Sequence, residues 1–163
     1  MKELILSMTL ALLLTTLIVS EAHSSDIERL KSQIEKLIGT EKIDSMIVLS
    51  KKYRKYSIDS SRIVAEEALK LSKETGYQTG IARSFVKIGI CESAIGNNDV
   101  AIEYFFKAKE LFEKLGDQEG MAVALNAIGL ANRYSGNLKT AIKYIQKSIE
   151  IKNEIGDMEQ VAI

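Results

Sequence analysis

Residues 98–115 carry apolar side chains at steps of three and four, with charged residues at the positions between them. This spacing predicts an amphipathic helix that buries one face. A second helix is predicted just before it, from about Phe85 to Gly96, because a glycine supplies the left-handed residue that ends a helix. Each such pair forms an antiparallel hairpin. The apolar positions of 98–115 are Val100, Ala101, Tyr104, Phe105, Ala108, Leu111 and Phe112.

The hairpin pattern recurs after forty residues. Residues 81–120 align with residues 121–160 without a gap, and 13 of the 40 aligned positions are identical. Chance would give roughly two or three identities, so the chain contains a repeat of stacked supersecondary units. Residues 41–80 form a fainter copy, and a first repeat is often atypical because one of its faces has no neighbour. The predicted fold is all-α, built from stacked antiparallel helix hairpins.

Two mid-helix glycines recur in this alignment, Gly89 and Gly129. A glycine there costs about 1 kcal/mol relative to alanine. We expect a close approach of the second helix at Ala101 and Ala141 to offset that cost.

The dipeptide Gly-Asp also recurs, at 116–117 and 156–157. We expect each glycine to end one helix and each aspartate to cap the next. The surrounding residues supply too few oxygen ligands for a calcium loop. They also lack the lysine and the serine or threonine of a phosphate-binding loop.

A different apolar pattern opens the chain. A lysine at position 2 precedes an apolar run from Leu4 to Val19, and the small residues Ser20 and Ala22 follow it. Residues 1–22 are therefore predicted to be a signal peptide that exports the chain, to the periplasm if the source is bacterial. The run is short for a membrane span of roughly 20 residues, and an uncleaved anchor is the alternative.

The pattern of apolar side chains in residues 23–40 predicts a short amphipathic helix that caps the first repeat. Ser25 and Glu28 have the spacing of a capping box at its start. Dimerisation through its apolar seam is the alternative, although two heptads are too few for a coiled coil. The seam consists of Ile27, Leu30, Ile34 and Leu37.

The repeat carries a large residue, an apolar-glycine pair, a glycine, an alanine, an aromatic residue and a further alanine at set intervals. In the second unit these are Phe85, Ile88, Gly89, Gly96, Ala101, Phe105 and Ala108. The pattern resembles the tetratricopeptide repeat (TPR) family in its roughly forty-residue variant. Two family features are absent: Glu92 and Asn132 replace a large aromatic residue, and no proline ends the unit.

The resemblance implies a right-handed superhelix, or α-solenoid. Its units would be a degenerate repeat at 41–80, full repeats at 81–120 and 121–160, and the start of a truncated further repeat at 161–163. It further implies a protein or peptide segment bound in a concave groove lined by the first helix of each hairpin. The implied groove positions are Ile43, Met46, Ser50, Tyr53, Arg54, Arg83, Val86, Ile90, Ser93, Ala94, Val123, Asn126, Leu130, Arg133 and Tyr134.

The family's carboxylate-clamping members carry lysine and asparagine at the inner positions, so we do not expect that binding mode here. The inner positions of this chain hold Met46, Ser50, Val86, Ile90, Asn126 and Leu130. Arg54, Arg83 and Arg133 would border an otherwise mixed apolar groove, which suits a peptide with acidic character. The alternative is that the three arginines lie on a solvated face and contribute little to binding.

Composition narrows the function further. The 22 basic and 22 acidic residues cancel, which argues against nucleic acid as a partner. The one histidine, His23, lies at the predicted cleavage point, and the one cysteine, Cys91, lies on an apolar helical stretch where burial is expected. We therefore expect no enzyme activity, no cofactor and no metal site.

Two alternatives to a peptide-binding scaffold remain. The chain could be the sensory amino-terminal part of a larger membrane signalling protein, because it resembles the exported arrays that precede kinase, cyclase or regulator domains in Bacteroidetes-type bacteria. Membrane contact would then come from an uncleaved signal or from a downstream region. It could also be a self-assembling scaffold, associating through the uncapped last repeat.

Overall fold

The computed structural model describes residues 25–156. The predicted signal peptide of residues 1–22 and the expected repeat start at 161–163 lie outside the described residues, as does Asp157. The chain divides into two units, and the described part of the first, 25–37, is helical from residue 25 to residue 35. Ser25 is the first described residue of that helix, and the capping box at its start stays a prediction. Glu28 pairs with Lys31, 2.9 Å away.

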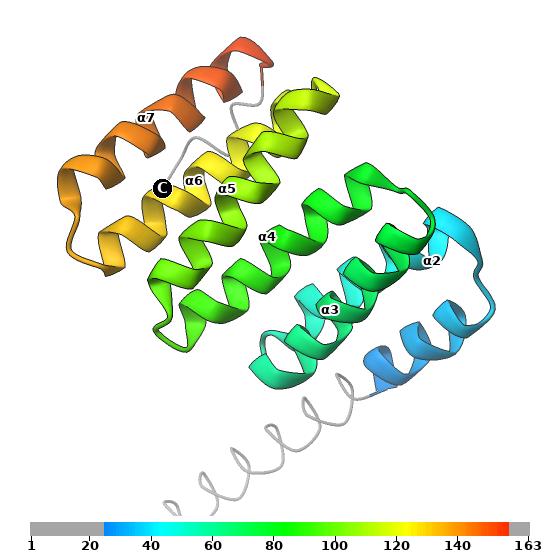
Figure 1. Ribbon diagram of the computed structural model, residues 1–163. Helices are drawn as coiled ribbons and strands as arrows, with labels where there is room; N and C mark the ends of the chain where they lie inside the picture. The colour runs from blue at the N-terminus through cyan, green and yellow to red at the C-terminus, as the bar shows by residue number, and fades with distance from the viewer. Residues whose placement is uncertain (1–24, 157–163) are drawn as a thin grey trace, which may run out of the picture. The chain divides into compact units, whose positions relative to one another are not determined.

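The second unit begins at Ile38 and contains six described helices. Each helix packs against the next, and the first helices of successive hairpins also touch, α2 against α4 and α4 against α6. This part of the chain contains helices and no strands (Figure 1), which confirms the all-α repeat solenoid. The helices are α2 (Gly39–Tyr53), α3 (Ile58–Glu74), α4 (Gln78–Ala94), α5 (Asn98–Leu115), α6 (Gln118–Tyr134) and α7 (Leu138–Glu154).

Within residues 25–156, no helix is both long enough and apolar enough to cross a membrane.

The joint between the second and third hairpins is built as the sequence predicts. Gly116 ends α5 with a φ of 69°, in the left-handed region that favours glycine. Asp117 then precedes α6, and its carboxylate accepts a hydrogen bond of 2.7 Å from the backbone N–H of Gly120. The first Gly-Asp pair is therefore a helix stop followed by a helix cap.

Close helix contact explains the mid-helix glycines, as predicted. A Cβ at Gly89 would lie 2.6 Å from Cε1 of Phe105 and 3.1 Å from the carbonyl oxygen of Ala101. One repeat later, a Cβ at Gly129 would lie 3.1 Å from the carbonyl oxygen of Ala141. Because a backbone carbonyl cannot rotate away as a side chain can, these two hairpins depend on the missing methyl group.

Polar contacts occupy the place of the family's missing aromatic residue. Glu92 of α4 is buried, and its carboxylate accepts hydrogen bonds from Arg62 of α3 at 3.3 Å and from Asn97 at 2.9 Å. Asn132, its equivalent in α6, donates to the carbonyl oxygen of Ile128 at 2.9 Å. Both buried polar side chains thus have partners, as burial requires.

Cys91 is buried beside this network, as predicted. Its thiol donates to the hydroxyl oxygen of Ser61 at 3.3 Å. Burial raises the pKa of the Cys91 thiol and so favours its neutral, unreactive form.

We predict that Gly89→Ala lowers the free energy of unfolding by about 1–3 kcal/mol, because the added methyl group overpacks the contact with Phe105 and Ala101. Helix propensity alone would instead stabilise this variant by about 1 kcal/mol. Urea denaturation monitored by circular dichroism measures the difference.

The double variant Gly89→Ala/Phe105→Leu is the control, because leucine leaves room where the phenyl ring stood. Its loss of stability should be less than the sum of the two single losses. An additive result, or a stabilised Gly89→Ala protein, would contradict the close contact.

Candidate functional site

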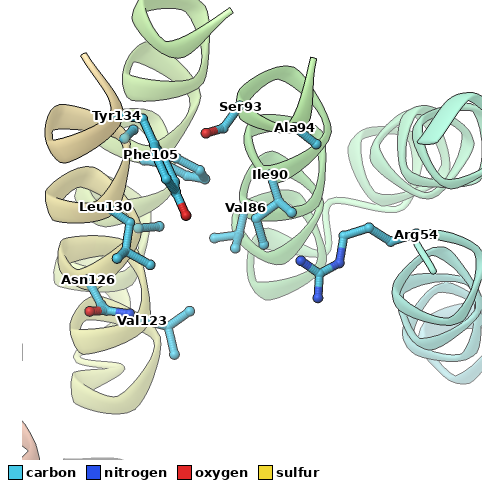
Figure 2. A pocket seen from close by; sticks show the side chains of 12 residues that line it. Arg54, Val86, Ile90, Ser93, Ala94, Phe105, Val123, Asn126, Leu130 and Tyr134 are labelled. Carbon is cyan, nitrogen blue, oxygen red and sulfur yellow. The ribbon is translucent and has the colours of Figure 1, made fainter. Parts of the chain in front are cut away.

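A groove of about 540 Å³ runs between the first helices of the second and third hairpins. Figure 2 shows Val123 and Leu130 of α6 facing Val86 and Ile90 of α4. Ser93 and Asn126 add polar groups that can hydrogen-bond a ligand. We call this surface the α4–α6 groove. Its full lining is Arg54, Val86, Ile90, Ser93, Ala94, Phe105, Val123, Asn126, Ala127, Leu130, Ala131 and Tyr134.

The structure brings together most of the groove positions proposed on α4 and α6. Eight of those ten positions line it, together with Arg54 from the end of α2: Val86, Ile90, Ser93, Ala94, Val123, Asn126, Leu130 and Tyr134. The sequence analysis missed Phe105, Ala127 and Ala131. Phe105 belongs to α5, yet its ring packs over Gly89 of α4 and reaches the groove. The recurrence of that glycine in the sequence was the signal that a side chain of α5 could approach the groove there.

The proposed groove positions on α2 lie elsewhere. The side chains of Ile43, Met46 and Ser50 are buried, and the Ser50 hydroxyl donates to the carbonyl oxygen of Ser61 at 2.9 Å. None of the three lines the groove, and α2 packs against both α3 and α4. Tyr53 is half-buried and does not line the groove. In the degenerate first repeat, only Arg54 at the end of α2 reaches it.

The three predicted arginines differ in their surroundings. Arg83 is paired with the carboxylate of Asp44 at 3.4 Å, and Asp44 also accepts a 3.1 Å hydrogen bond from the hydroxyl of Tyr77. Arg133 lies over the ring of Tyr134, 5.3 Å from its centroid, and does not line the groove. Arg54 has no carboxylate within 4.0 Å in the described part of the chain. It approaches the groove from the end of α2 (Figure 2).

A second hollow of about 260 Å³ continues the groove toward the start of α6, since both share Val86 and Val123. Its lining adds Lys87, which the sequence analysis missed. Burial lowers the pKa of Lys87, and the charges of three neighbouring cations lower it further. Those cations are Lys51, Arg54 and Arg83.

A metal site is not indicated in this region. No group of three or more histidine, cysteine, aspartate or glutamate side chains among residues 25–156 is arranged to hold a metal ion.

Comparison with known proteins identifies the repeat. The family model for the tetratricopeptide repeat matches residues 80–154, which span α4 to α7. The two repeat units within this match are tetratricopeptide repeats. TPR arrays are protein-interaction scaffolds and are typically non-catalytic, which agrees with a groove lined by apolar side chains. No curated protein matches the chain significantly.

One solved structure shows a similar TPR-like fold. Aspartyl phosphate phosphatase F from Bacillus subtilis superposes with a TM-score of 0.71 at 18% sequence identity. The match covers 83% of this chain and 39% of that protein, so the chain spans well under half of its length. The MamA protein matches over 89% of this chain and 91% of its own, with 15% identity and a TM-score of 0.38.

The contact between Tyr77 and Asp44 makes a testable prediction. Burial first, and then the hydrogen bond and charge of Asp44, raise the pKa of the Tyr77 phenol, while Arg83 lowers it. In an Asp44→Asn variant the pKa of Tyr77 should fall toward its ordinary value and stay above it, because burial remains. A pH titration of the ring carbons by NMR measures this pKa.

The same shift affects stability at high pH. A raised phenol pKa stabilises the fold below the ordinary tyrosine pKa, and this contribution is lost as the pH rises through the folded-state pKa. Asp44→Asn should therefore lose less stability over that alkaline window than the wild type. An unchanged Tyr77 pKa in the variant would contradict the contact.

Proposed function

We propose that this chain is a scaffold that holds a short protein segment in the α4–α6 groove. The observation that carries the proposal is the pair of exposed apolar side chains that border it, since Val123 is 37% and Tyr134 63% exposed to solvent. Apolar surface gathered along a groove is typical of interaction sites. The TPR family, whose arrays are protein-interaction scaffolds, supports the same function.

The groove suits a segment that presents apolar side chains at intervals. Val86, Ile90, Val123 and Leu130 would contact them from two helices, and Asn126 would hydrogen-bond the backbone of the segment. Binding would bury the exposed apolar atoms and gain about 25 cal/mol per Å² removed from water. Peptides selected from a random display library against the wild-type protein provide the ligand for the tests below.

We predict that the double variant Val123→Asn/Leu130→Asn weakens the binding of these peptides by about tenfold or more, because polar groups replace two apolar contacts. Isothermal titration calorimetry measures the dissociation constants. Thermal melts establish that the variant is folded.

A matched control replaces two apolar residues of similar exposure on α5. Val100 and Leu115 are 43% and 44% exposed, and neither lines the groove or the hollow beside it. Val100→Asn/Leu115→Asn should leave peptide affinity unchanged. Equal losses in both double variants, or no loss in the first, would reject the α4–α6 groove as the binding site.

Self-association is a second candidate function, favoured by one observation on α7. Leu138 and Ile142 are 61% and 57% exposed. Ile102 of α5, the equivalent of Ile142 one repeat earlier, packs instead against a cluster that includes Ile128 of α6. Among the described residues, α7 thus exposes a face whose equivalent on α5 is packed against α6.

If α7 pairs with a second copy, sedimentation velocity should show a dimer that forms at micromolar concentrations. Leu138→Glu/Ile142→Glu should shift the protein to monomer, because burying two carboxylates in an apolar interface is unfavourable. Only monomer in the wild type across this range would exclude self-association through α7.

We also propose that residues 1–22 export the chain. Expression of the full chain in a Gram-negative host should yield a periplasmic protein whose mass, measured by intact mass spectrometry, corresponds to a start near His23. A full-length chain that remains in the cytoplasmic fraction would refute export.

A further inference from the structure

Four cationic side chains lie near one another at the end of α2 and on α4, and three of them line the groove or the hollow beside it. They are Lys51, Arg54, Arg83 and Lys87. Of these four cations, only Arg83 has a carboxylate within 4.0 Å among residues 25–156, that of Asp44. Lys51, Arg54 and Lys87 form no ion pair within that distance in the same part of the chain. Two cations without an ion pair, Arg54 and Lys87, therefore line the groove and the hollow beside it.

Lys87 occupies the least favourable of these positions. It lies half-buried in the hollow that continues the groove, next to Arg83 and Val86. Both burial and the surrounding cations oppose its positive charge. A charge kept where it destabilises the folded state is typical of binding sites, because stability is lost there in favour of function.

The acidic groups near this cluster do not neutralise it. Asp44 is shared between Arg83 and the hydroxyl of Tyr77. Across the hollow, the carboxylate of Asp117 accepts the Gly120 N–H as the cap of α6, and Glu119 is exposed to solvent. The hollow is thus basic on the α4 side and acidic at the start of α6.

We propose that Arg54 and Lys87 bind the carboxylates of an acidic protein segment whose apolar side chains occupy the α4–α6 groove. This inference rests on the proposed function and names the chemistry of its partner. The partner is a polypeptide because Val86 lines both hollows, so a ligand that meets the cations also meets apolar surface. A free phosphate or a nucleic acid backbone has no apolar side chains for Val123 and Leu130.

The decisive variant is Lys87→Met, which keeps much of the side-chain length and removes the charge. We expect its melting temperature to rise by about 2–5 °C, because the opposed charge is gone. We expect its affinity for peptides selected on the wild type to fall about tenfold or more. If Lys87 had a purely structural role, Lys87→Met would lower the melting temperature and cause no selective loss of peptide affinity.

Lys114→Met is the matched control, since Lys114 is an exposed lysine on α5 that lines neither hollow. It should leave both the melting temperature and the affinity unchanged. The selected peptides should be enriched in aspartate and glutamate beside leucine, isoleucine or phenylalanine. Replacing their acids with asparagine and glutamine should weaken binding to the wild type and have little further effect on Lys87→Met.

Two results separate this inference from the proposed function. In the first, the selected peptides lose affinity for Val123→Asn/Leu130→Asn, but they are not acidic and bind Lys87→Met as well as the wild type. The carboxylate-binding subsite would then be wrong, while the groove would remain the binding site. If no selected peptide depends on the groove residues, the proposed function fails and the subsite fails with it.

Inorganic phosphate and a single-stranded oligonucleotide serve as competing probes. The proposal would also be overturned, in favour of a phosphate site, if either probe displaced the peptides, lost affinity in Lys87→Met and kept its affinity in Val123→Asn/Leu130→Asn. Failure of both to compete at physiological salt supports a polypeptide carboxylate.

Discussion

The arrangement of the repeats depends on a missing methyl group. At Gly89 and Gly129 the second helix of the hairpin comes so close that a Cβ would lie 3.1 Å from a backbone carbonyl oxygen. This contact sets the distance between α4 and α5, and between α6 and α7. It also places the ring of Phe105 over Gly89, from where it lines the groove between α4 and α6. The contact between Phe105 and Gly89 therefore determines both the packing of the α4–α5 hairpin and part of the groove lining.

A second constraint joins successive hairpins. Glu92 lies on α4, its partner Arg62 on α3 and its other partner Asn97 directly before α5. One buried carboxylate thus connects three helices at the position where the family has an aromatic residue. Removing one partner would leave the carboxylate buried with fewer hydrogen bonds, which is more costly than losing an exposed pair. Here polar contacts replace the packing of a large ring.

Much of this architecture could be predicted from the sequence, because helical spacing and the forty-residue recurrence of Gly89 are local signals. The groove positions on α4 and α6 followed from the same period. Those on α2 did not, because the first repeat has diverged and its inner residues Met46 and Ser50 are buried. Sequence spacing could not show that Arg83 pairs with Asp44, 39 residues away, or that Lys87 lies unpaired among cations. Such facts depend on the approach of separate helices.

The central claim is that a ligand segment occupies the surface between α4 and α6. Titrating the isotopically labelled protein with a selected peptide, and following backbone amide shifts by NMR, locates the contact directly. The account predicts that the largest shifts fall on the α4 and α6 residues that line the groove, with Arg54 and Lys87 at one border. Shifts concentrated on α3 or α7, with the groove residues unmoved, would contradict it.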